Sequence, residues 1–226
     1  MKHIVVLTGA GMSAESGLKT FRDANGLWEG HDVMKVASPE GFARNPELVL
    51  EFYNQRRRQL LEVKPNTAHY DLANLEHDYK VSIITQNVDD LHERSGSSNV
   101  LHLHGELLKA RSTYNEQDVV DWTTDLILGD VCQQGYQMRP HIVWFGEAVP
   151  MIEKAIEVCV TADVLMIIGT SMQVYPAASL MHYVPNGTQT FFIDPNPAMN
   201  SSINLTVISE PATVGVSQAI EQLKLL

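Results

Sequence analysis

The chain is poor in cysteine, in basic residues and in long apolar runs. Its 226 residues include two cysteines, Cys132 and Cys159, and neither belongs to a Cys-x-x-Cys pair. So few cysteines exclude a disulfide framework and indicate a reducing compartment. We therefore interpret both cysteines as small packing residues. No apolar run approaches the length of a membrane span, and the run from Ile4 to Leu7 is too short for a secretion signal. We therefore expect a cytoplasmic protein with no membrane partner.

Basic side chains are outnumbered by acidic ones. The sequence has 16 Lys and Arg against 27 Asp and Glu, a formal net charge of -11. Because phosphate backbones are bound mainly through basic residues, this balance argues against a nucleic-acid partner. A protein substrate that presents lysines suits the surface better. The chain, 44% hydrophobic, is long enough for one sizeable core, since domains commonly have roughly 100 to 200 residues.

Short apolar runs rich in β-branched residues alternate with helical patterns. Continuous apolar runs are typical of strands buried on both faces of a parallel sheet. The expected strands are residues 4–7, 81–84, 100–103, 164–168, 190–193 and 205–208, and the expected helices are residues 46–61, 67–76, 151–161, 176–183 and 214–225. This alternation predicts an α/β fold with a Rossmann-like, doubly wound parallel sheet.

Residues 106–140 lack this alternation and are rich in polar side chains. We interpret them as a small module inserted into a single domain that covers residues 1–226. The large, Rossmann-like part then comprises residues of about 1–30, 78–105 and 141–226. Residues 31–77 form a helical insert.

Polar, glycine-containing or amide-rich segments follow five of the expected strands. They are Thr8 to Gly11, Thr85 to Asp89, His104 to Glu106, Gly169 to Ser171 and Asp194 to Asn196. In open α/β sheets, ligands bind beyond the carboxyl ends of the strands. We therefore expect the five segments to line one crevice.

The segment from Gly9 to Ala14 matches the G-x-G-x-x-[GA] pattern of a dinucleotide-binding turn. Its glycines permit a tight turn and a close approach of backbone N–H groups to a pyrophosphate. A dehydrogenase would carry an acidic residue about 20 residues later at a strand end. Here Asp32 has nearly that spacing but lies on no expected strand. The pattern argues against simple hydride transfer and for a loop from Ser16 to Trp28 that folds over the cofactor.

Two side chains of that loop suit a cofactor. Arg22 could neutralise a phosphate oxygen, and Phe21 could cover a reactive ring. The alternative is a surface arginine beside a core phenylalanine.

Two histidines, His102 and His104, lie at the end of one expected strand. We expect them to face opposite sides, with one hydrogen-bonded structurally and the other in the crevice. Gly105, at the end of the strand, favours His104 as the crevice residue. A histidine has a reference pKa of about 6.5, so His104 could act as a base near neutral pH.

Gln86, Asn87 and Asp89 form a compact polar set at another strand exit. Amides can orient a carboxamide such as nicotinamide without adding charge, and a carboxylate can accept from its NH2 group. The alternative is an Asx turn that caps the next helix.

Five motifs follow one another in a distinctive order. They are Gly-Ala-Gly-x-Ser-x-x-Ser-Gly-x-x-x-Phe-Arg from Gly9 to Arg22, Thr-Gln-Asn-Val-Asp from Thr85 to Asp89, His104-Gly105, Val-Trp-Phe-Gly-Glu from Val143 to Glu147, and Gly-Thr-Ser from Gly169 to Ser171. Together they resemble the sirtuin family of NAD-dependent protein lysine deacylases, and the resemblance covers nearly the whole chain.

The resemblance implies a reaction in which an acyl-lysine oxygen attacks the ribose carbon that bears nicotinamide. Nicotinamide leaves, and the acyl group moves to ADP-ribose. His104 would be the base that activates the ribose hydroxyls, while Gln86, Asn87 and Asp89 would hold nicotinamide and its ribose. The rest of NAD would contact Gly9, Ala10, Gly11, Ser13, Ser16, Gly17, Phe21, Arg22, Trp28, Gly169, Thr170, Ser171, Asp194, Pro195, Asn196 and Ala212.

The resemblance also implies how an acylated protein binds. The substrate peptide would pair as an added strand with the main chain around Phe145 to Glu147 and Gln173 to Tyr175, a mode that tolerates many sequences. The expected substrate-binding residues on these segments are Val143, Phe145, Gly146, Glu147 and Val174.

Tyr53 and Arg56 are three residues apart on an expected helix and so share a face. An arginine with a tyrosine hydroxyl can bind a carboxylate, which an acetyl group lacks. The pair resembles that of sirtuins that prefer succinyl or malonyl lysine, and the small Ala24 is consistent with a roomy pocket. The alternative for Arg56 is a solvated basic face shared with the two arginines that follow it. We expect a desuccinylase and demalonylase with some deacetylase activity.

The sequence departs from the family in its small module. Sirtuins usually carry four cysteines there that bind a structural zinc, but residues 106–140 hold only Cys132, and Ser112 stands near the first ligand position. A closed zinc site needs four ligands, so we predict no metal. The module would then rest on packing by Tyr114, Val119, Trp122, Leu126 and Tyr136.

Asp194 is a second departure, because sirtuins commonly have an asparagine near this position. An aspartate can still accept hydrogen bonds from ribose hydroxyls. Two alternative functions remain open: an inactive NAD or ADP-ribose sensor, and a mono-ADP-ribosyltransferase. His104 argues against the sensor, and the Tyr53 and Arg56 pair argues against the transferase.

Overall fold

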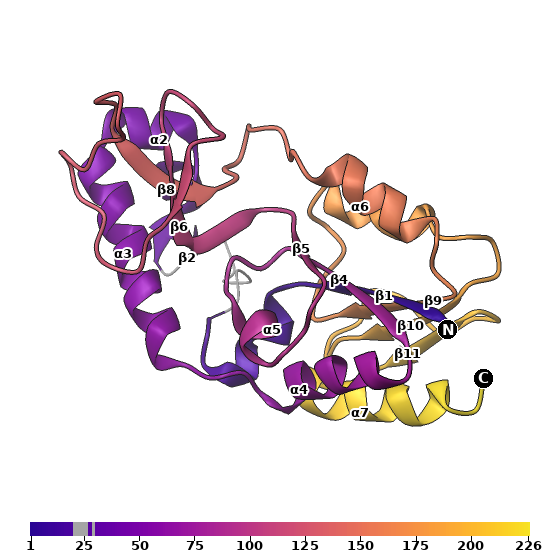
Figure 1. The fold of residues 1–226 in the computed structure, drawn as a ribbon. Helices are drawn as coiled ribbons and strands as arrows, with labels where there is room; N and C mark the ends of the chain where they lie inside the picture. The colour runs from indigo at the N-terminus through magenta and orange to yellow at the C-terminus, as the bar shows by residue number, and fades with distance from the viewer. Residues whose placement is uncertain (20–26, 29) are drawn as a thin grey trace.

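The computed structural model describes residues 1–19, 27–28 and 30–226. Its centre is a six-stranded sheet, parallel throughout, in the order β11-β10-β9-β1-β4-β5 (Figure 1). The strands are β1 (His3–Thr8), β4 (Lys80–Thr85), β5 (Val100–His102), β9 (Val164–Ile168), β10 (Gln189–Ile193) and β11 (Leu205–Ile208). All six expected strands and the Rossmann-like, doubly wound fold are confirmed.

The strand order reverses beside β1, which pairs with β4 on one side and with β9 on the other. In such a sheet the loops that leave the two strands next to the reversal separate, and a crevice opens between them. The loops that follow β1 and β9 begin at Gly9 and Gly169. The fold therefore brings these two glycine segments to the crevice.

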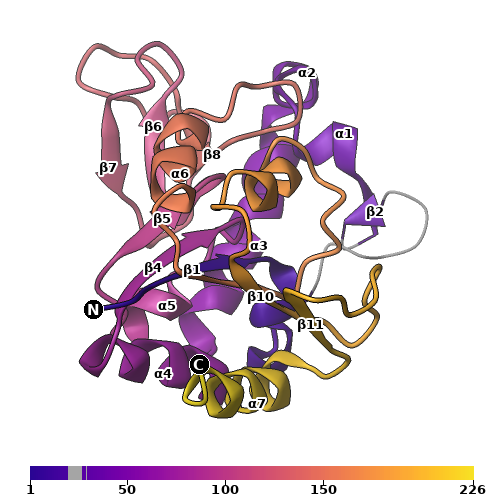
Figure 2. The same cartoon turned by 90° about the vertical axis from the view of Figure 1, so that its right-hand side faces the viewer.

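Helices cover both faces of the sheet (Figures 1 and 2). On one face lie α4 (Thr67–Asn74) and α7 (Ala212–Leu223), whose buried side chains join the cluster around Ile4 and Met166. On the other face lie α6 (Ile152–Cys159) and the 3-10 helix η4 (Ala177–His182), which pack around Val5 and Leu165. Among the described residues, no helix is both long and apolar enough to cross a membrane.

Two expected helices differ in detail. Within residues 176–183 the structure forms the 3-10 helix η4 (Ala177–His182), which follows a cis peptide bond between Tyr175 and Pro176. Residues 67–76 divide into α4 and the start of the 3-10 helix η3 (Leu75–His77). Although α4 falls in the expected helical insert, it packs on α7 and on the large sheet. The division of the chain at residues 30, 77, 105 and 140 stays a prediction.

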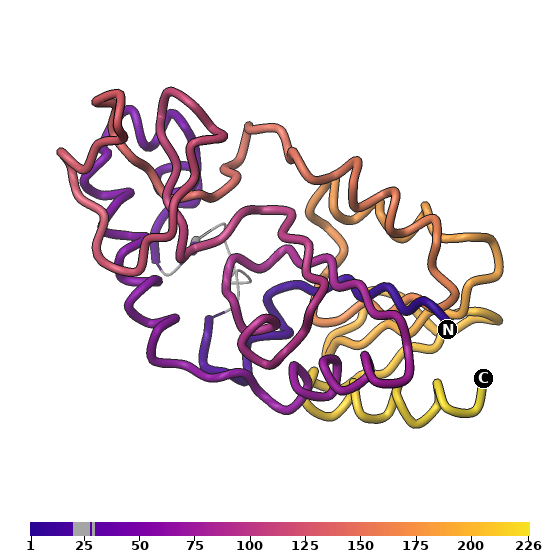
Figure 3. The backbone as a smooth tube through the Cα atoms, viewed as in Figure 1, coloured from indigo at the N-terminus to yellow at the C-terminus, as the bar shows by residue number. Residues whose placement is uncertain are grey.

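The small module and the first long helix form the opposite end of the molecule from the two termini (Figure 3). The antiparallel strands β6 (Gly105–Ser112), β7 (Val119–Asp121) and β8 (Met138–Ile142) make its sheet, on which α3 (Pro46–Glu62) packs. The remaining elements are η1 (Ala10–Met12), η2 (Ala14–Ser16), β2 (Leu27–Trp28), β3 (His31–Asp32), α1 (Val33–Val36), α2 (Pro39–Arg44) and α5 (Leu91–Arg94).

The expected packing residues of the small module play unequal parts. Leu126 is fully buried with Leu50 of α3, and Trp122 packs against the same cluster. Tyr114 and Tyr136 stack with ring centroids 4.3 Å apart but remain exposed. The described residues contain no group of three or more His, Cys, Asp or Glu side chains that could hold a metal ion, and the absence of zinc stays a prediction.

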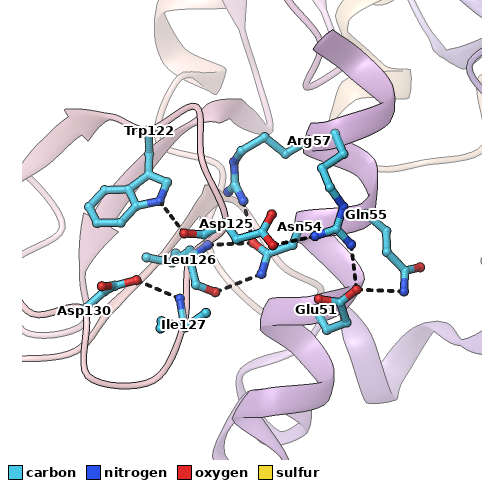
Figure 4. Close-up of polar contacts among 10 residues, drawn as sticks. Glu51, Asn54, Gln55, Arg57, Trp122, Asp125, Leu126, Ile127 and Asp130 are labelled. Carbon is cyan, nitrogen blue, oxygen red and sulfur yellow. Dashed lines mark hydrogen bonds and ion pairs between the residues drawn. The ribbon is translucent and has the colours of Figure 1, made fainter. Parts of the chain in front are cut away.

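A buried polar clamp, missed by the sequence analysis, joins α3 to the small module (Figure 4). The amide of Asn54 donates to the Leu126 carbonyl at 3.0 Å and accepts from the Leu126 N–H at 2.8 Å. Asn54 also accepts from Arg57 at 2.7 Å, and Arg57 donates to the Leu107 carbonyl at 3.1 Å. Arg58 adds an exposed ion pair to Asp125. These contacts tie the module to the helix that carries Tyr53 and Arg56.

Replacing Asn54 by alanine should lower the free energy of unfolding by about 2 to 3 kcal/mol. The change leaves the buried N–H and carbonyl of Leu126 and one N–H group of Arg57 without the hydrogen bonds that Asn54 provides. Urea unfolding followed by circular dichroism measures the loss. Gln55→Ala is the matched control, since it removes an exposed hydrogen bond to Glu51 from the same helix. Equal stability of the two variants would contradict a structural role of the clamp.

Candidate active site

A cavity of about 340 Å³ lies at the carboxyl ends of the central strands. Four of the five expected strand exits reach it, since its lining includes Gly9, Ala10, Gln86, Asn87, Asp89, His104, Gly169, Thr170 and Ser171. From outside the large sheet it is lined by Tyr53 and Arg56 of α3 and by residues 142–147, which contain the end of β8 and the loop after it. The fifth exit, residues 194–196, does not line the cavity.

The glycines of the first turn also have a packing role that the sequence did not indicate. The N–H of Gly9 donates to the Ile168 carbonyl at 3.0 Å, and that of Gly11 donates to the Gly169 carbonyl at 2.8 Å. A Cβ atom on Gly11 would lie 2.6 Å from the Cα of Gly169. These glycines let the loops after β1 and β9 pack together, and the approach of a pyrophosphate to other N–H groups of this turn stays a prediction.

A buried hydrogen-bonded chain connects the first turn to the loop after β4. The side-chain amide of Asn87 donates to the Ser13 hydroxyl at 3.2 Å, and Ser13 donates to a carboxylate oxygen of Asp89 at 2.9 Å. The other oxygen of Asp89 accepts from the Leu91 N–H, so an Asx turn also forms at the start of α5. The two interpretations of this segment are therefore compatible. The chain holds Asn87 and Asp89 at the cavity wall.

Burial raises the pKa of Asp89 to about 6, although hydrogen bonds from Leu91 and Ser13 act in the opposite direction. An aspartate in the unfolded chain titrates near 3.9. Between about pH 4 and pH 6 the folded protein therefore retains a proton that the unfolded chain has lost. Stability from this group is present at low pH and is lost as the pH rises through that window.

Replacing Asp89 by asparagine should thus stabilise the protein more at pH 7.5 than at pH 4.5, by about 2 kcal/mol. Denaturant unfolding of the wild type and the variant at both pH values, without NAD, measures the difference. The surface substitution Asp78→Asn is the control. A gain that does not depend on pH would show that Asp89 ionises normally in the fold.

His104 is half-buried at the cavity wall, and its Nδ1 lies 3.0 Å from the Gln86 carbonyl oxygen. A carbonyl oxygen only accepts, so Nδ1 carries the hydrogen and Nε2 keeps its lone pair. Burial lowers the pKa of His104, while the bond to Gln86 opposes the shift. The ring is therefore neutral near pH 7 and can take a proton at Nε2.

His102 makes different contacts, as expected, but for another reason. Side chains two residues apart on a regular strand point to the same side, and the pair separates because β5 ends at His102. His102 donates from Nδ1 to the Asn87 carbonyl at 3.1 Å, and its Nε2 lies 2.8 Å from Glu93. Burial alone would lower the pKa of His102, but the bond to Glu93 and its charge raise it above the usual value. This histidine supports the Asn87 loop from behind.

Tyr53 and Arg56 line the cavity from α3, one helical turn apart. Tyr53 is fully buried, and its oxygen accepts from the indole N–H of Trp144 at 2.9 Å. The guanidinium of Arg56 lies over the Phe52 ring, 3.3 Å from its centroid, and donates to the Phe52 carbonyl. The helix thus presents an arginine among aromatic rings.

The side chain of Glu147 acts inside the protein. It accepts from Arg139 at 2.6 Å, from Arg111 at 3.2 Å and from the Trp144 N–H at 2.7 Å. Burial alone would raise the pKa of Glu147, but Arg139 and the Trp144 N–H lower it below the usual value. The segment from Val143 to Glu147 is therefore fixed from the small-module side, while Val143, Phe145 and Gly146 also line the cavity.

The other expected residues fall into three groups. Trp28 and Val174 line the cavity, whereas Gly11, Ser16, Gly17, Asp194, Pro195, Asn196 and Ala212 do not. Ser16 accepts a hydrogen bond from Asn66 at 3.2 Å, and buried Asp194 accepts one from the N–H of Asn196 at 2.9 Å. Phe21, Arg22 and Ala24 lie outside the described residues.

Several lining residues were not expected. They are Ala37, Gln59, Leu60, Leu107, Ile142, Trp144, Val149 and Pro176. Helical periodicity could have found Gln59 and Leu60, which lie three and four residues after Arg56 on the same helix. Trp144 belongs to the motif from Val143 to Glu147. Its neighbours in the sequence do not predict its hydrogen bond to Tyr53, which is 91 residues away.

The sheet, with its cavity beside the strand reversal, defines an α/β protein with a site at the topological switch point. A model of the Sir2 family matches residues 9–176, and the chain belongs to that family. An NAD-dependent protein deacylase of Helicobacter pylori is 56% identical over 225 residues, which cover 99% of this chain and 98% of that protein. One from Bacteroides thetaiotaomicron is 53% identical over 233 residues, covering 100% and 98%.

Solved structures agree with this assignment. A crystal structure of a Sir2 homolog in complex with NAD is similar with a TM-score of 0.88 and 36% sequence identity, covering 99% of this chain and 90% of that one. The similarity extends over both the large sheet and the small module. The sirtuin resemblance is therefore confirmed at the level of family and fold.

Proposed function

We propose that this protein is an NAD-dependent deacylase that removes succinyl and malonyl groups, and also acetyl groups, from lysine side chains of cytoplasmic proteins. The observation that supports it is the meeting of three residue sets at one cavity. His104 comes from the end of β5, Gln86 to Asp89 follow β4, and Tyr53 and Arg56 lie on α3. Removal of an acidic acyl group with NAD requires a general base, groups that bind the nicotinamide carboxamide, and groups that bind the acyl carboxylate. The three residue sets would supply these in that order.

The residues present fit NAD. Asn87 and Asp89 offer a buried amide and a carboxyl group at the cavity wall, which match the donors and acceptors of a carboxamide without a fixed positive charge. Gln86 donates to the Thr170 hydroxyl at 3.2 Å, so the loops after β4 and β9 are joined across the cavity. NAD, when bound, supplies the ribose carbon that loses nicotinamide and the hydroxyl that receives the acyl group.

His104 would act on the ribose hydroxyl. Its neutral ring, with Nδ1 bonded to Gln86, leaves Nε2 to accept the hydroxyl proton. Because the carbonyl of Gln86 fixes the ring, proton acceptance at Nε2 needs no change of tautomer. General base catalysis of this kind typically contributes a factor of about 10² to 10⁴ in rate.

Tyr53 and Arg56 would select the acyl group. An arginine binds a carboxylate through a planar fork of N–H donors, and removal of water strengthens the contact. An acetyl group has no carboxylate and gains nothing from the pair. The guanidinium of Arg56 lies beside the rings of Trp28 and Phe52, and its positive charge would attract a carboxylate more strongly than a neutral acyl group.

The substrate main chain would lie along the rim formed by Gly146 and residues 173–175. Phe145 and Tyr175 are exposed there, 42% and 73% respectively. The N–H groups of Phe145 and Glu147 already donate to Ala37 and Trp144, so strand addition would use the remaining main-chain groups of these segments.

One assay tests the proposed reaction. The protein is incubated with NAD and a succinylated peptide, with NAD omitted in the control, and the products are separated by mass spectrometry. A deacylase yields nicotinamide, O-succinyl-ADP-ribose and free lysine in equal amounts. An NAD sensor yields none of them, and an ADP-ribosyltransferase yields nicotinamide with ADP-ribose attached to protein; either outcome would refute the proposal.

A further inference from the structure

The hydrogen bond between Trp144 and Tyr53 has a fixed direction. The indole nitrogen lies 2.9 Å from the phenol oxygen, and both residues are at most 2% exposed. An indole N–H can only donate, whereas a phenol can donate or accept. The oxygen of Tyr53 therefore accepts from Trp144, and the hydrogen of its own hydroxyl is left to donate elsewhere.

The ring of Trp144 is held on several sides. The guanidinium of Arg139 lies 3.3 Å from the centre of its ring, and Phe42 lies 5.3 Å from it, centroid to centroid. The Trp144 N–H of the main chain donates to Glu147, which also binds Arg139 at 2.6 Å. The indole therefore cannot turn away from Tyr53 without losing its contact with the guanidinium of Arg139, which Glu147 holds in place.

Tyr53 is a stable donor in this setting. Burial raises the pKa of its phenol well above the usual value, although the bond from Trp144 acts in the opposite direction. Both Tyr53 and Trp144 line the cavity, as does Arg56 one helical turn along α3. A neutral phenol whose oxygen is already engaged can present its hydrogen to a carboxylate oxygen beside Arg56.

We infer that Trp144 is a specificity-determining positioning residue. Its N–H sets the polarity of the Tyr53 hydroxyl, so that the pair of Tyr53 and Arg56 offers donors only and favours acyl groups that end in a carboxylate. The inference rests on the proposed acyl preference. By this inference Trp144, which follows β8 of the small module, also helps to select the acyl chain. It acts through Tyr53 rather than by contact with the acyl group.

The test is a double-mutant cycle on matched succinyl and acetyl peptides. Trp144→Phe removes the donor and keeps an aromatic ring, so the succinyl-to-acetyl ratio of kcat/KM should fall about tenfold, with the acetyl value changed less than threefold. In the Tyr53→Phe background, which lacks the hydroxyl, Trp144→Phe should lower the ratio no further. Trp122→Phe, at a tryptophan that does not line the cavity, is the matched control and should leave the ratio unchanged.

Two results would overturn the inference. One is an unchanged ratio in Trp144→Phe, and the other is an equal loss with and without the Tyr53 hydroxyl. If Trp144→Phe fails to fold, site-specific replacement of Trp144 by benzothienylalanine, which keeps the size of the indole but has no N–H, gives the same comparison. Failure of the proposed acyl preference is recognised separately, because Tyr53→Phe and Arg56→Met alone would then leave the ratio unchanged.

Discussion

Replacing His104 by asparagine should lower kcat/KM by about 10² to 10⁴ on succinyl and acetyl peptides alike. The loss should be common to both substrates, because the role proposed for His104 is on the ribose hydroxyl and not on the acyl chain. The side chain lines the cavity, and its Nδ1 is committed to the Gln86 carbonyl. Asparagine keeps a polar group at this position but cannot accept a proton.

Steady-state kinetics with saturating NAD measures this loss. The exposed substitution His77→Asn is the matched control and should retain wild-type rates. Since burial lowers the pKa of His104, the wild-type rate should decline with falling pH at a lower pH than a free histidine would cause. A His104→Asn variant with more than a tenth of the wild-type activity would rule out the assigned role.

Replacing Arg56 by methionine should lower kcat/KM for a succinyl peptide by about 100-fold and leave that for the acetyl peptide within threefold. Truncating one partner of a desolvated charge pair typically weakens binding by about 2 to 5 kcal/mol. A neutral acyl group forms no such pair with Arg56, so its binding should not weaken in this way. Methionine keeps much of the length of the chain and its contact with the Phe52 ring. The effect should appear mainly in KM, because we propose that the arginine binds the acyl end and not the reacting atoms.

The neighbouring Arg58 provides the matched control. Arg58→Met removes an exposed arginine whose partners are Glu51 and Asp125, away from the cavity. It should leave both activities unchanged. Arg56→Lys should recover only part of the succinyl activity, because lysine keeps the charge but not the fork of donors. Equal losses on both peptides in Arg56→Met would contradict the acyl assignment.

The sheet was predictable because its signal is local. Each of the six strands is a continuous apolar run, and a polar or glycine segment follows where the strand reaches the crevice. Prediction of the residues that meet at the cavity needed one more premise, that parallel strands end at the same edge of the sheet. His104 and the segment from Gln86 to Asp89 follow from that premise and from the order of the motifs.

What could not be predicted depends on partners that are distant in the sequence. Asn54 looks like an ordinary polar residue on a helix, and only the fold places it opposite the backbone of Leu126. The glycines of the first turn fit a dinucleotide pattern, yet they are required by the approach of Gly169. Trp144 reaches Tyr53 across 91 residues. Each of these contacts is set by packing between elements and not by a local pattern.

We propose that one cavity combines NAD-dependent acyl transfer with selection of acidic acyl groups. The most direct test is a competition in which the wild-type protein receives NAD and equal amounts of succinyl and acetyl peptides of the same sequence. The structure predicts that both peptides are converted, that the succinyl peptide is consumed first, and that nicotinamide release equals the total lysine freed. Faster consumption of the acetyl peptide, or lysine freed without nicotinamide, would contradict it.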